Sequence, residues 1–166
     1  MTSNYTTEQF MDMIDDYKGI IIKISGVYAS GQQQRQDLRQ DIILELWNSL
    51  KRFDGGCKIS TWIYRIALNV SMNYHRKQKR ISSFQGDLGD NELFGLISDS
   101  DNSPQLELLY SSIEQLNSIN KAIVLLYLDG NTHEQISSIM GISKTNVGTR
   151  MSRAKEELKK IAYSKL

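Results

Sequence analysis

The stretch THEQISSIMGISKTNVGTRMSRAKEEL, residues 132–158, is the most informative part of the sequence, because it predicts two short helices joined by a tight turn. Thr132 and Gln135 form a capping box at which the first helix begins, and Gly141 ends that helix. Ser143 then caps the second helix. The residues that this register turns inward are Ile136, Met140, Ile142, Val147 and Met151. Two helices in this order, with a glycine at the turn, are typical of a helix-turn-helix.

A helix-turn-helix places its second helix in the major groove of DNA, where its early outward residues face the base edges. The outward residues here are all able to donate hydrogen bonds to bases or phosphates, and they are Lys144, Thr145, Asn146, Thr149, Arg150 and Arg153. Gly148 costs about 1 kcal/mol in a helix interior relative to alanine, and its missing side chain permits close approach to DNA. We therefore predict contact with duplex DNA. The alternative is an ordinary helical hairpin with a solvated basic face, because such motifs also match by chance.

Two further helices are expected before this motif, and the last helix continues beyond it. Ser103 and Pro104 form a cap followed by proline at the first helical position. The apolar residues that continue this helix are Leu106, Leu109, Ile113 and Leu116. A next helix, around residues 121–129, stops at Gly130. The last helix carries Ala154, Leu158 and Ile161 after the motif. Residues 104–164 are therefore assigned to one small helical domain.

Residues 81–103 have the composition of a linker. They are rich in Ser, Gly, Asp and Asn and contain no Lys or Arg. Their apolar residues are scattered, and include Leu93, Phe94, Leu96 and Ile97. We expect an acidic, flexible linker with room for one short helical turn.

Three helices are predicted in residues 6–80. Thr6 and Gln9 make a capping box, which an amphipathic stripe follows: Phe10, Ile14, Tyr17, Ile21, Ile24 and Tyr28. A second helix, from about Arg35 to Arg52, has apolar residues every fourth position and ends at DGGCK: Leu38, Ile42, Leu46 and Leu50. A third helix, capped by Ser60, has the buried stripe Ile63, Ile66, Ala67, Val70 and Tyr74. The predicted fold class is all-α, with two small helical domains joined by an acidic flexible linker.

The formal net charge of +1 conceals a strong separation of charge along the chain. Residues 51–80 carry 8 Lys and Arg against 1 Asp, and residues 119–166 carry 8 basic against 4 acidic residues. Residues 81–118, between them, carry 7 acidic residues and no basic one, while residues 1–50 carry 4 basic against 7 acidic. Two basic blocks separated by an acidic one suggest two surfaces that face a polyanion.

The stretch RIALNVSMNYHRKQKR, residues 65–80, gives the third helix a basic side opposite its buried stripe. The residues of this side are Arg65, Asn69, Asn73, Arg76 and Arg80. Cations toward a helix C-terminus complement its dipole, which is the simplest explanation. Contact with nucleic acid is the other explanation, because Trp62 and Tyr64 are expected to be exposed and aromatic faces stack on unpaired bases. The second basic block favours nucleic acid.

Composition narrows the remaining classes of protein. With 166 residues, 40% hydrophobic and 23% charged, the chain fits one soluble domain or two small ones. No apolar run approaches the length that crosses a bilayer and no leader opens the sequence, so a cytoplasmic location is expected. Cys57 is the single cysteine, and with only His75 and His133 beside it there is no zinc ligand set. We expect a free thiol, no metal and no cofactor.

Three ordered motifs resemble those of the extracytoplasmic-function (ECF) sigma factors of bacterial RNA polymerase: DLRQDIILELW, STWIYRIALNVSMNYHRKQKR and GISKTNVGTRMSRAKEEL. The likeness extends from about residue 10 to residue 162. It implies that residues 6–80 are sigma region 2 and residues 104–164 are sigma region 4, with no catalysis in either. It also implies a transcription initiation factor that directs core RNA polymerase to promoters and helps to melt the minus-ten region.

The resemblance further implies roles for individual residues. The first motif docks on the clamp coiled coil of the largest polymerase subunit through Asp37, Gln40, Asp41, Leu46 and Trp47. For Leu46 and Trp47, ordinary helix packing is at least an equal alternative. The loop DGGCKIS and the following helix hold the minus-ten element, including a base turned out of the stack, through Lys58, Trp62, Arg65, Asn69, Asn73, Arg76, Lys77 and Arg80. The minus-thirty-five duplex is read by Lys144, Thr145, Asn146, Thr149, Arg150 and Arg153.

The partners that the resemblance implies are core polymerase, through its clamp and its flap, promoter DNA and a regulatory anti-sigma protein. Membrane contact is expected only through the anti-sigma protein. The sequence departs from the family at Asn73, where an acid is usual, at Asn117 or Ser118, where proline is common, and at Ser137, where alanine is common.

Two other functions fit parts of the sequence, namely a stand-alone DNA-binding regulator and an enzyme that acts on nucleic acid. A stand-alone dimeric repressor or activator uses the same helix-turn-helix and binds palindromic duplex without polymerase, but the asymmetric layout of two basic blocks favours the sigma interpretation. An enzyme acting on nucleic acid has only His75, His133 and Glu134 as acid–base candidates. His133 and Glu134 are better explained as first-turn residues, where an acid suits the helix dipole.

Overall fold

The computed structural model describes residues 4–85 and 103–165, and these form two units, each with a core of its own. Unit 1 is Met1–Glu92 and unit 2 is Leu93–Leu166. The elements within the described ranges are helices, as the all-α prediction requires. None of these helices is both long enough and apolar enough to cross a bilayer. Most of the expected linker, with its proposed helical turn, lies outside the described residues.

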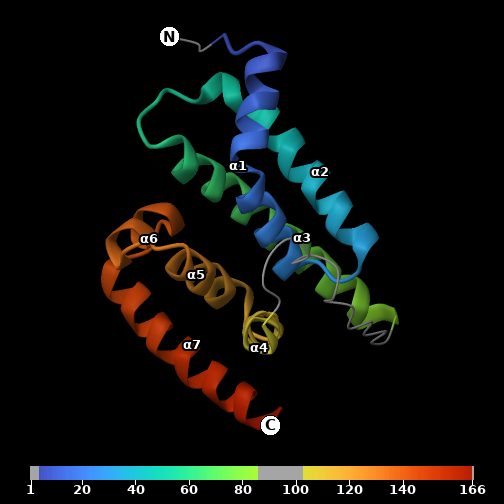
Figure 1. Cartoon of the computed structure of the whole chain (residues 1–166), viewed down its shortest axis with the longest axis vertical. Helices are drawn as coiled ribbons and strands as arrows, with labels where there is room; N and C mark the ends of the chain where they lie inside the picture. The colour runs from blue at the N-terminus through green and yellow to red at the C-terminus, as the bar shows by residue number, and fades with distance from the viewer. Residues whose placement is uncertain (1–3, 86–102, 166) are drawn as a thin grey trace. The chain divides into compact units, whose positions relative to one another are not determined.

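The described part of unit 1, residues 4–85, has three α-helices packed side by side, each in contact with the other two (Figure 1). They are α1 (Thr7–Tyr28), α2 (Gln32–Ser49), extended by a 3-10 turn η1 (Leu50–Arg52), and α3 (Ile59–Gln85). Most residues of the predicted apolar stripes face one another and form the core, because burial of apolar surface offsets the entropy of ordering the helices. The exceptions are only half-buried, and they are Tyr17, Ile66, Val70 and Tyr74. The largest fully buried side chains of this unit are Ile24, Leu38, Ile42, Leu46, Ile63 and Leu68.

The helix ends in unit 1 agree with the sequence at Thr6 and differ at two other places. The Thr6 Oγ1 atom accepts from the backbone N–H of Gln9 at 3.2 Å, and the Gln9 side chain accepts in return at 2.9 Å. The helix α2 begins earlier than predicted, directly after Gly31, whose φ of 87° suits glycine. The helix α3 begins at Ile59, so the prediction that Ser60 is its cap is wrong.

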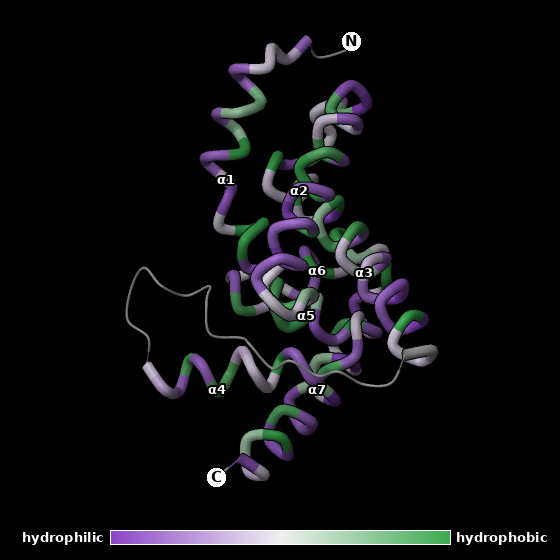
Figure 2. The backbone as a smooth tube through the Cα atoms, turned by 90° about the vertical axis from the view of Figure 1, so that its right-hand side faces the viewer, coloured by the Kyte–Doolittle hydropathy of each residue, from purple (hydrophilic) through white to green (hydrophobic). Residues whose placement is uncertain are grey.

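Over residues 103–165, unit 2 contains four helices, and α7 contacts each of the other three. They are α4 (Pro104–Ile113), α5 (Ser118–Leu128), α6 (His133–Met140) and α7 (Lys144–Ser164). Figure 2 shows hydrophobic and hydrophilic residues alternating along α7, as expected for a helix with one buried face. The largest fully buried side chains described in this unit are Ile113, Ile123, Leu125, Leu126, Ile136 and Val147.

The predicted helix-turn-helix is present as α6, a turn and α7. Thr132 and Gln135 form the capping box, and Gly141 adopts the left-handed conformation, with φ of 69°, that ends α6. The Ser143 Oγ atom accepts from the backbone N–H of Asn146 at 3.1 Å. Ser137, where the family commonly has alanine, donates its hydroxyl to the carbonyl of Ile142 and so ties α6 to the turn. The local signals in this stretch therefore predicted its backbone correctly.

Several details of unit 2 differ from the prediction. The helix α4 ends at Ile113, so Leu116 lies in the following turn, although it is still buried. The helix α5 begins at Ser118 because the Asn117 side chain caps it, accepting from the backbone N–H of Asn120. In α6, Ile139 is buried where Met140 was expected, and Met140 and Ile142 are only half-buried.

Candidate nucleic-acid interface

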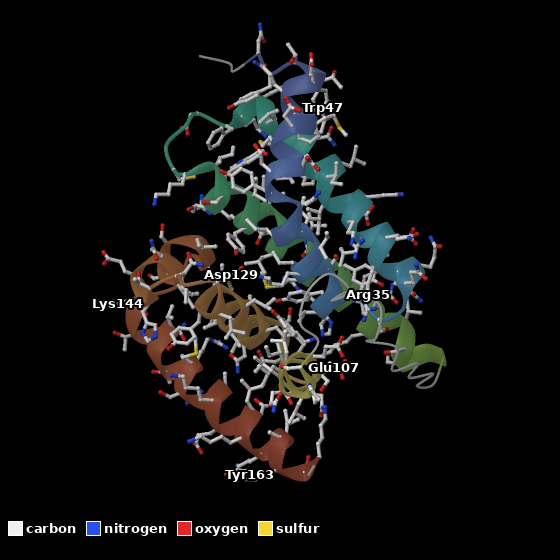
Figure 3. The ribbon with its side chains drawn as sticks, viewed as in Figure 1. Arg35, Trp47, Glu107, Asp129, Lys144 and Tyr163 are labelled. Carbon is white, nitrogen blue, oxygen red and sulfur yellow. The ribbon has the colours of Figure 1, made fainter. Side chains whose placement is uncertain are left out.

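The early residues of α7 present a polar, basic face to solvent. Val147, Met151 and Ala154 are buried and hold one side of the helix against its neighbours. The opposite side carries the predicted contact residues, of which Lys144, Thr145, Asn146, Thr149 and Arg153 are exposed. Lys144 lies at the amino-terminal end of α7 (Figure 3). The structure thus brings the predicted major-groove residues together on one helix face.

Arg150 is the exception on this face, because it is half-buried and engaged within unit 2. Its Nε atom donates to Oδ1 of Asn146 at 3.1 Å, four residues earlier on α7. Its Nη1 atom donates to Oδ1 of Asn120 on α5 at 3.4 Å. We call these three residues the Asn120–Arg150–Asn146 network. No feature of the sequence had suggested a part for Asn120.

The fold does not need a glycine at position 148. A Cβ atom built there meets only the Nδ1 atom of His133, at 4.0 Å, which is ordinary van der Waals contact. Since Gly148 lies inside α7, it costs about 1 kcal/mol relative to alanine without any gain in packing. This agrees with the suggestion that the bare backbone matters for what approaches α7 from outside.

The basic side of α3 is exposed along its second half. Asn69, Asn73, Arg76, Lys77 and Arg80 are exposed, as predicted, and Arg65 is half-buried. Lys79, which the sequence analysis had not assigned, is exposed as well. In the part of the chain that the structure describes, no carboxylate forms an ion pair with any of the cations from residue 76 to residue 80.

The helix dipole does not explain the position of these cations, because α3 is longer than predicted. The helix continues to Gln85, and its last turn contains no basic residue. The favourable effect of the dipole on a cation falls off within the last turn. The cations at residues 76–80 therefore lie in the body of the helix and gain little from it.

Trp62 and Tyr64 are buried, so the prediction that they are exposed aromatics is wrong. Each has only 8% of its surface exposed. The Trp62 ring packs on Phe53, with 5.0 Å between ring centroids. Phe53 belongs to the loop that leads into α3, so this contact anchors the loop to the helix. Lys58, in the same loop, is exposed as expected.

The acidic face of α2 is exposed, but one of its predicted apolar contacts is not. Asp37, Gln40 and Asp41 are exposed, and the Gln33 side chain donates to Asp37 at 2.9 Å. Leu46 has no exposed surface, which favours the alternative of ordinary helix packing for this residue.

Two apolar side chains of α2 do reach solvent. Leu44 is 58% exposed and lies one turn beyond Gln40 and Asp41, where the sequence analysis had missed it. Trp47 is 38% exposed and packs edge-on against Phe10 of α1, with ring centroids 4.9 Å apart (Figure 3).

The acids on α2 also act on α3. Burial raises the pKa of Tyr74, and the negative charges of Asp37 and Asp41 raise it further.

At the start of α2, the buried Arg35 donates from Nε to the carbonyl of Ala29 at 3.1 Å. Burial, together with the charge of Arg35, lowers the pKa of Arg39. Cys57 is a half-buried free cysteine.

Comparison with protein families identifies both units. The family model of sigma-70 region 2 matches residues 13–81, and that of sigma-70 region 4 matches residues 106–158. These two matches together extend over more than half of the chain. The chain belongs to the sigma-70 family. The region 4 match includes α6, the turn and α7 as far as residue 158, and the region 2 match includes both α2 and the basic side of α3.

Two relatives show where this sigma factor stands within the family. It is 27% identical over 165 residues to the ECF RNA polymerase sigma factor SigW of Bacillus subtilis (strain 168), covering 92% of this chain and 88% of that one. It is 31% identical over 134 residues to the ECF RNA polymerase sigma-E factor of Escherichia coli (strain K12), covering 74% and 70%. The protein is therefore an ECF sigma factor, as its motifs implied.

Solved structures of sigma factors share its fold. The sigma factor RpoE from Bartonella quintana, solved with the anti-sigma factor NepR, matches with a TM-score of 0.76 at 18% identity, over 93% of this chain and 97% of that chain. CnrH, solved with the cytosolic domain of CnrY, matches with a TM-score of 0.68 at 17% identity, over 96% and 90%. Sigma factors direct RNA polymerase to promoters and are not themselves catalysts, so we interpret the exposed faces of this sigma factor as binding surfaces.

Proposed function

We propose that this sigma factor holds one promoter at two places, with α3 on the opened minus-ten strand and α7 on the minus-thirty-five duplex. Residues 6–80 then act as region 2, residues 104–164 as region 4, and residues 81–103 as the linker. The observation that carries the proposal is the row of exposed cations on α3, which neither an ion pair among the described residues nor the helix dipole explains.

At the minus-ten element, the basic side of α3 holds phosphates while its amides face the bases. The cations are Lys58, Arg65, Arg76, Lys77 and Arg80, with Lys79 added, and the amides are Asn69 and Asn73. Trp62 contributes indirectly and not by stacking on DNA, because its packing on Phe53 fixes the loop that receives the extruded base. Extruding a base costs a few kcal/mol, which phosphate contacts and stacking must offset.

At the minus-thirty-five element, α7 lies in the major groove with its first two turns against the bases. Lys144 and Arg153 bind phosphates, and Thr145, Asn146 and Thr149 lie between them. The Thr149 hydroxyl donates to the carbonyl of Thr145 at 3.1 Å, so its oxygen remains available as an acceptor.

On polymerase, we place α2 against the clamp coiled coil of the largest subunit, with unit 2 on the flap. The contacts proposed are the exposed polar residues Asp37, Gln40 and Asp41, the partly exposed Trp47, and Leu44 in place of the buried Leu46. An exposed leucine beside carboxylates is the composition of an interface centre with a polar rim. Because the factor acts where polymerase is, we place it in the cytoplasm.

We also propose an anti-sigma protein as the regulator. The two structural relatives, RpoE of Bartonella quintana and CnrH, were solved with NepR and with the cytosolic domain of CnrY. Such a protein covers the same exposed faces until a signal releases them. A membrane is then reached only through that partner.

Run-off transcription with purified core polymerase, with and without this chain, on a library of genomic promoters tests the proposal. We expect promoter-specific initiation that requires the chain and that Asn69→Ala and Lys77→Gln each reduce. The matched control is Lys18→Gln, because Lys18 is an exposed lysine of unit 1 that pairs with Asp15 in its own helix and lies outside the basic side of α3. Equal transcription without the chain refutes the proposal, and so does equal loss with the control.

A further inference from the structure

We propose that Arg150 is a positioning residue, which turns the Asn146 amide so that its amino group faces the DNA and selects guanine at one position of the minus-thirty-five element. This inference rests on the proposed function of α7. It assigns the Asn120–Arg150–Asn146 network to base selection and distinguishes Arg150 from the phosphate-binding cations of the same helix.

The network fixes which end of each amide faces Arg150. A guanidinium has five N–H donors and no acceptor, so only amide oxygens of Asn120 and Asn146 can face it. The contacts are the Nε donation to Asn146 at 3.1 Å and the Nη1 donation to Asn120 at 3.4 Å. The Asn146 amino group must therefore point away from Arg150.

Asn120 holds the network in place from the neighbouring helix. It is only 5% exposed, and its backbone N–H donates to the Asn117 side chain at 2.9 Å in the cap of α5. A side chain in such a site has few alternative rotamers. Asn120 therefore supplies a fixed point from which Arg150 reaches the exposed Asn146 on α7.

The orientation of the amide has a consequence for base selection. Asparagine reads adenine with both groups of its amide, the oxygen accepting from N6 and the amino group donating to N7. In Asn146 the oxygen is already engaged by a cation, which also disfavours the N6 amino donor nearby. The group that Asn146 then offers to a base is a donor, its amino group, which carries two N–H bonds. Guanine presents two acceptors, N7 and O6, in the major groove, and matches them.

The test is transcription by the full chain and core polymerase from a library in which the minus-thirty-five element is randomised, with sequencing of the products. With the wild-type chain we expect guanine at one position, and with Asn146→Ala we expect that preference to fall by about tenfold. Arg150→Lys keeps the charge but lacks the planar fork that reaches both oxygens, so adenine should become acceptable at the same position.

Asn120→Ala should weaken the same guanine preference, although Asn120 is buried and on another helix. Thermal unfolding of this variant shows whether unit 2 remains folded. If unit 2 of Asn120→Ala is unfolded, the base preference of Arg150→Lys tests the inference instead. The control Arg153→Gln removes an exposed cation outside the network and should lower initiation at all sequences alike.

The outcomes separate this inference from the proposed function. An unchanged base preference in Arg150→Lys, or an adenine preference that depends on Asn146 in the wild-type chain, overturns the inference and leaves the sigma function standing. A wild-type chain that directs no initiation from any member of the library overturns both.

Discussion

Leu44 and Leu46 illustrate how much two neighbouring positions of one helix differ. A step of two residues turns about 200° around a helix, so the two side chains face opposite sides. Leu46 has no exposed surface and lies in the core of unit 1, whereas Leu44 is 58% exposed beside the acidic residues of α2. Stability and polymerase binding should therefore depend on different leucines.

Leu46→Ala should lower the free energy of unfolding by about 2–5 kcal/mol, because it removes buried methyl groups and leaves a cavity. Leu44→Ala should change that free energy by less than about 0.5 kcal/mol, as surface substitutions usually do, and should weaken the complex with core polymerase. Urea unfolding and a polymerase binding titration measure the two effects. Intact polymerase binding by Leu44→Ala contradicts the proposed docking face.

Tyr74 should hold its proton above the pH at which an ordinary tyrosine loses it. Burial, and then Asp37 and Asp41, raise its pKa in the folded chain. The unfolded pKa is about 10, so the stability that Tyr74 contributes is complete below that pH and is lost as the pH rises through the folded pKa. The tyrosinate absorbance of the wild-type chain minus that of Tyr74→Phe isolates this group.

Asp37→Asn and Asp41→Asn should each move the pKa of Tyr74 back toward its ordinary value, because each removes a negative charge that opposes ionisation. A difference titration that already shows the ordinary pKa in the wild-type chain contradicts the arrangement of α2 and α3.

Among the described helices, α3 and α7 each carry an outward feature that packing within their own unit does not explain. The cations of α3 lie before its last turn, where the dipole has little effect on them. In α7, a glycine occupies a site at which a Cβ atom fits without conflict. Each helix therefore carries a feature that the fold does not require, as the proposed contacts with nucleic acid predict.

Gly148→Ala separates the needs of the fold from those of DNA binding. The change should raise the free energy of unfolding of unit 2 by up to about 1 kcal/mol, because alanine favours the helix and meets only His133 at contact distance. It should weaken binding to the minus-thirty-five duplex if the backbone of α7 approaches the DNA closely. Calorimetry and transcription from a fixed promoter measure the two. If Gly148→Ala is more stable and equally active in transcription, the absence of a side chain at position 148 is not needed for DNA binding.

Arg76→Gln combined with Lys77→Gln should make promoter binding by the polymerase complex less sensitive to salt. Each cation that neutralises a single-strand phosphate contributes about 0.7 to the slope of log K against log salt, so the slope should fall by about 1.4. Binding titrations over a range of salt concentrations give this slope. Lys18→Gln should leave it unaltered, and an unaltered slope in the double variant means that these cations do not contact phosphates.

Across the whole molecule, the chain is divided into two helical units, each stabilised by its own core, and we propose that both bind one promoter. The core of unit 1 comes from α1, α2 and α3, and the core of unit 2 comes from α4 to α7, with α7 contacting the other three helices. The basic blocks fall one in each unit. A promoter contacted by both gains affinity from their linkage as well as from either surface.

Residues 4–85 and residues 103–165, produced as separate fragments, should each unfold cooperatively, because each contains its own core. A mixture of the two should support less promoter-specific initiation than the intact chain at equal concentration, because the second contact is no longer intramolecular. Calorimetry and run-off transcription make the comparison. A fragment without a cooperative transition contradicts the division of the chain into self-sufficient units.

The all-α class, the order of the helices and the backbone of the helix-turn-helix could be predicted from the residues alone. These follow from local chemistry, since a cap such as Thr132, a left-handed glycine such as Gly141 and a period of 3.6 residues act within a few positions. The exposed cations of α3 and α7 were predictable for the same reason, because a periodic apolar stripe defines the opposite side of its own helix.

Which residues the neighbouring helices cover depends on how the helices pack, and it could not be predicted from one helix at a time. The helix α3 contacts both α1 and α2, so its buried arc is wider than one stripe and includes Trp62 and Tyr64. The Asn120–Arg150–Asn146 network joins residues 30 positions apart, and no local pattern marks Asn120 as a partner. Burial and long-range hydrogen bonds depend on which surfaces meet, and that is a property of packing rather than of any single helix.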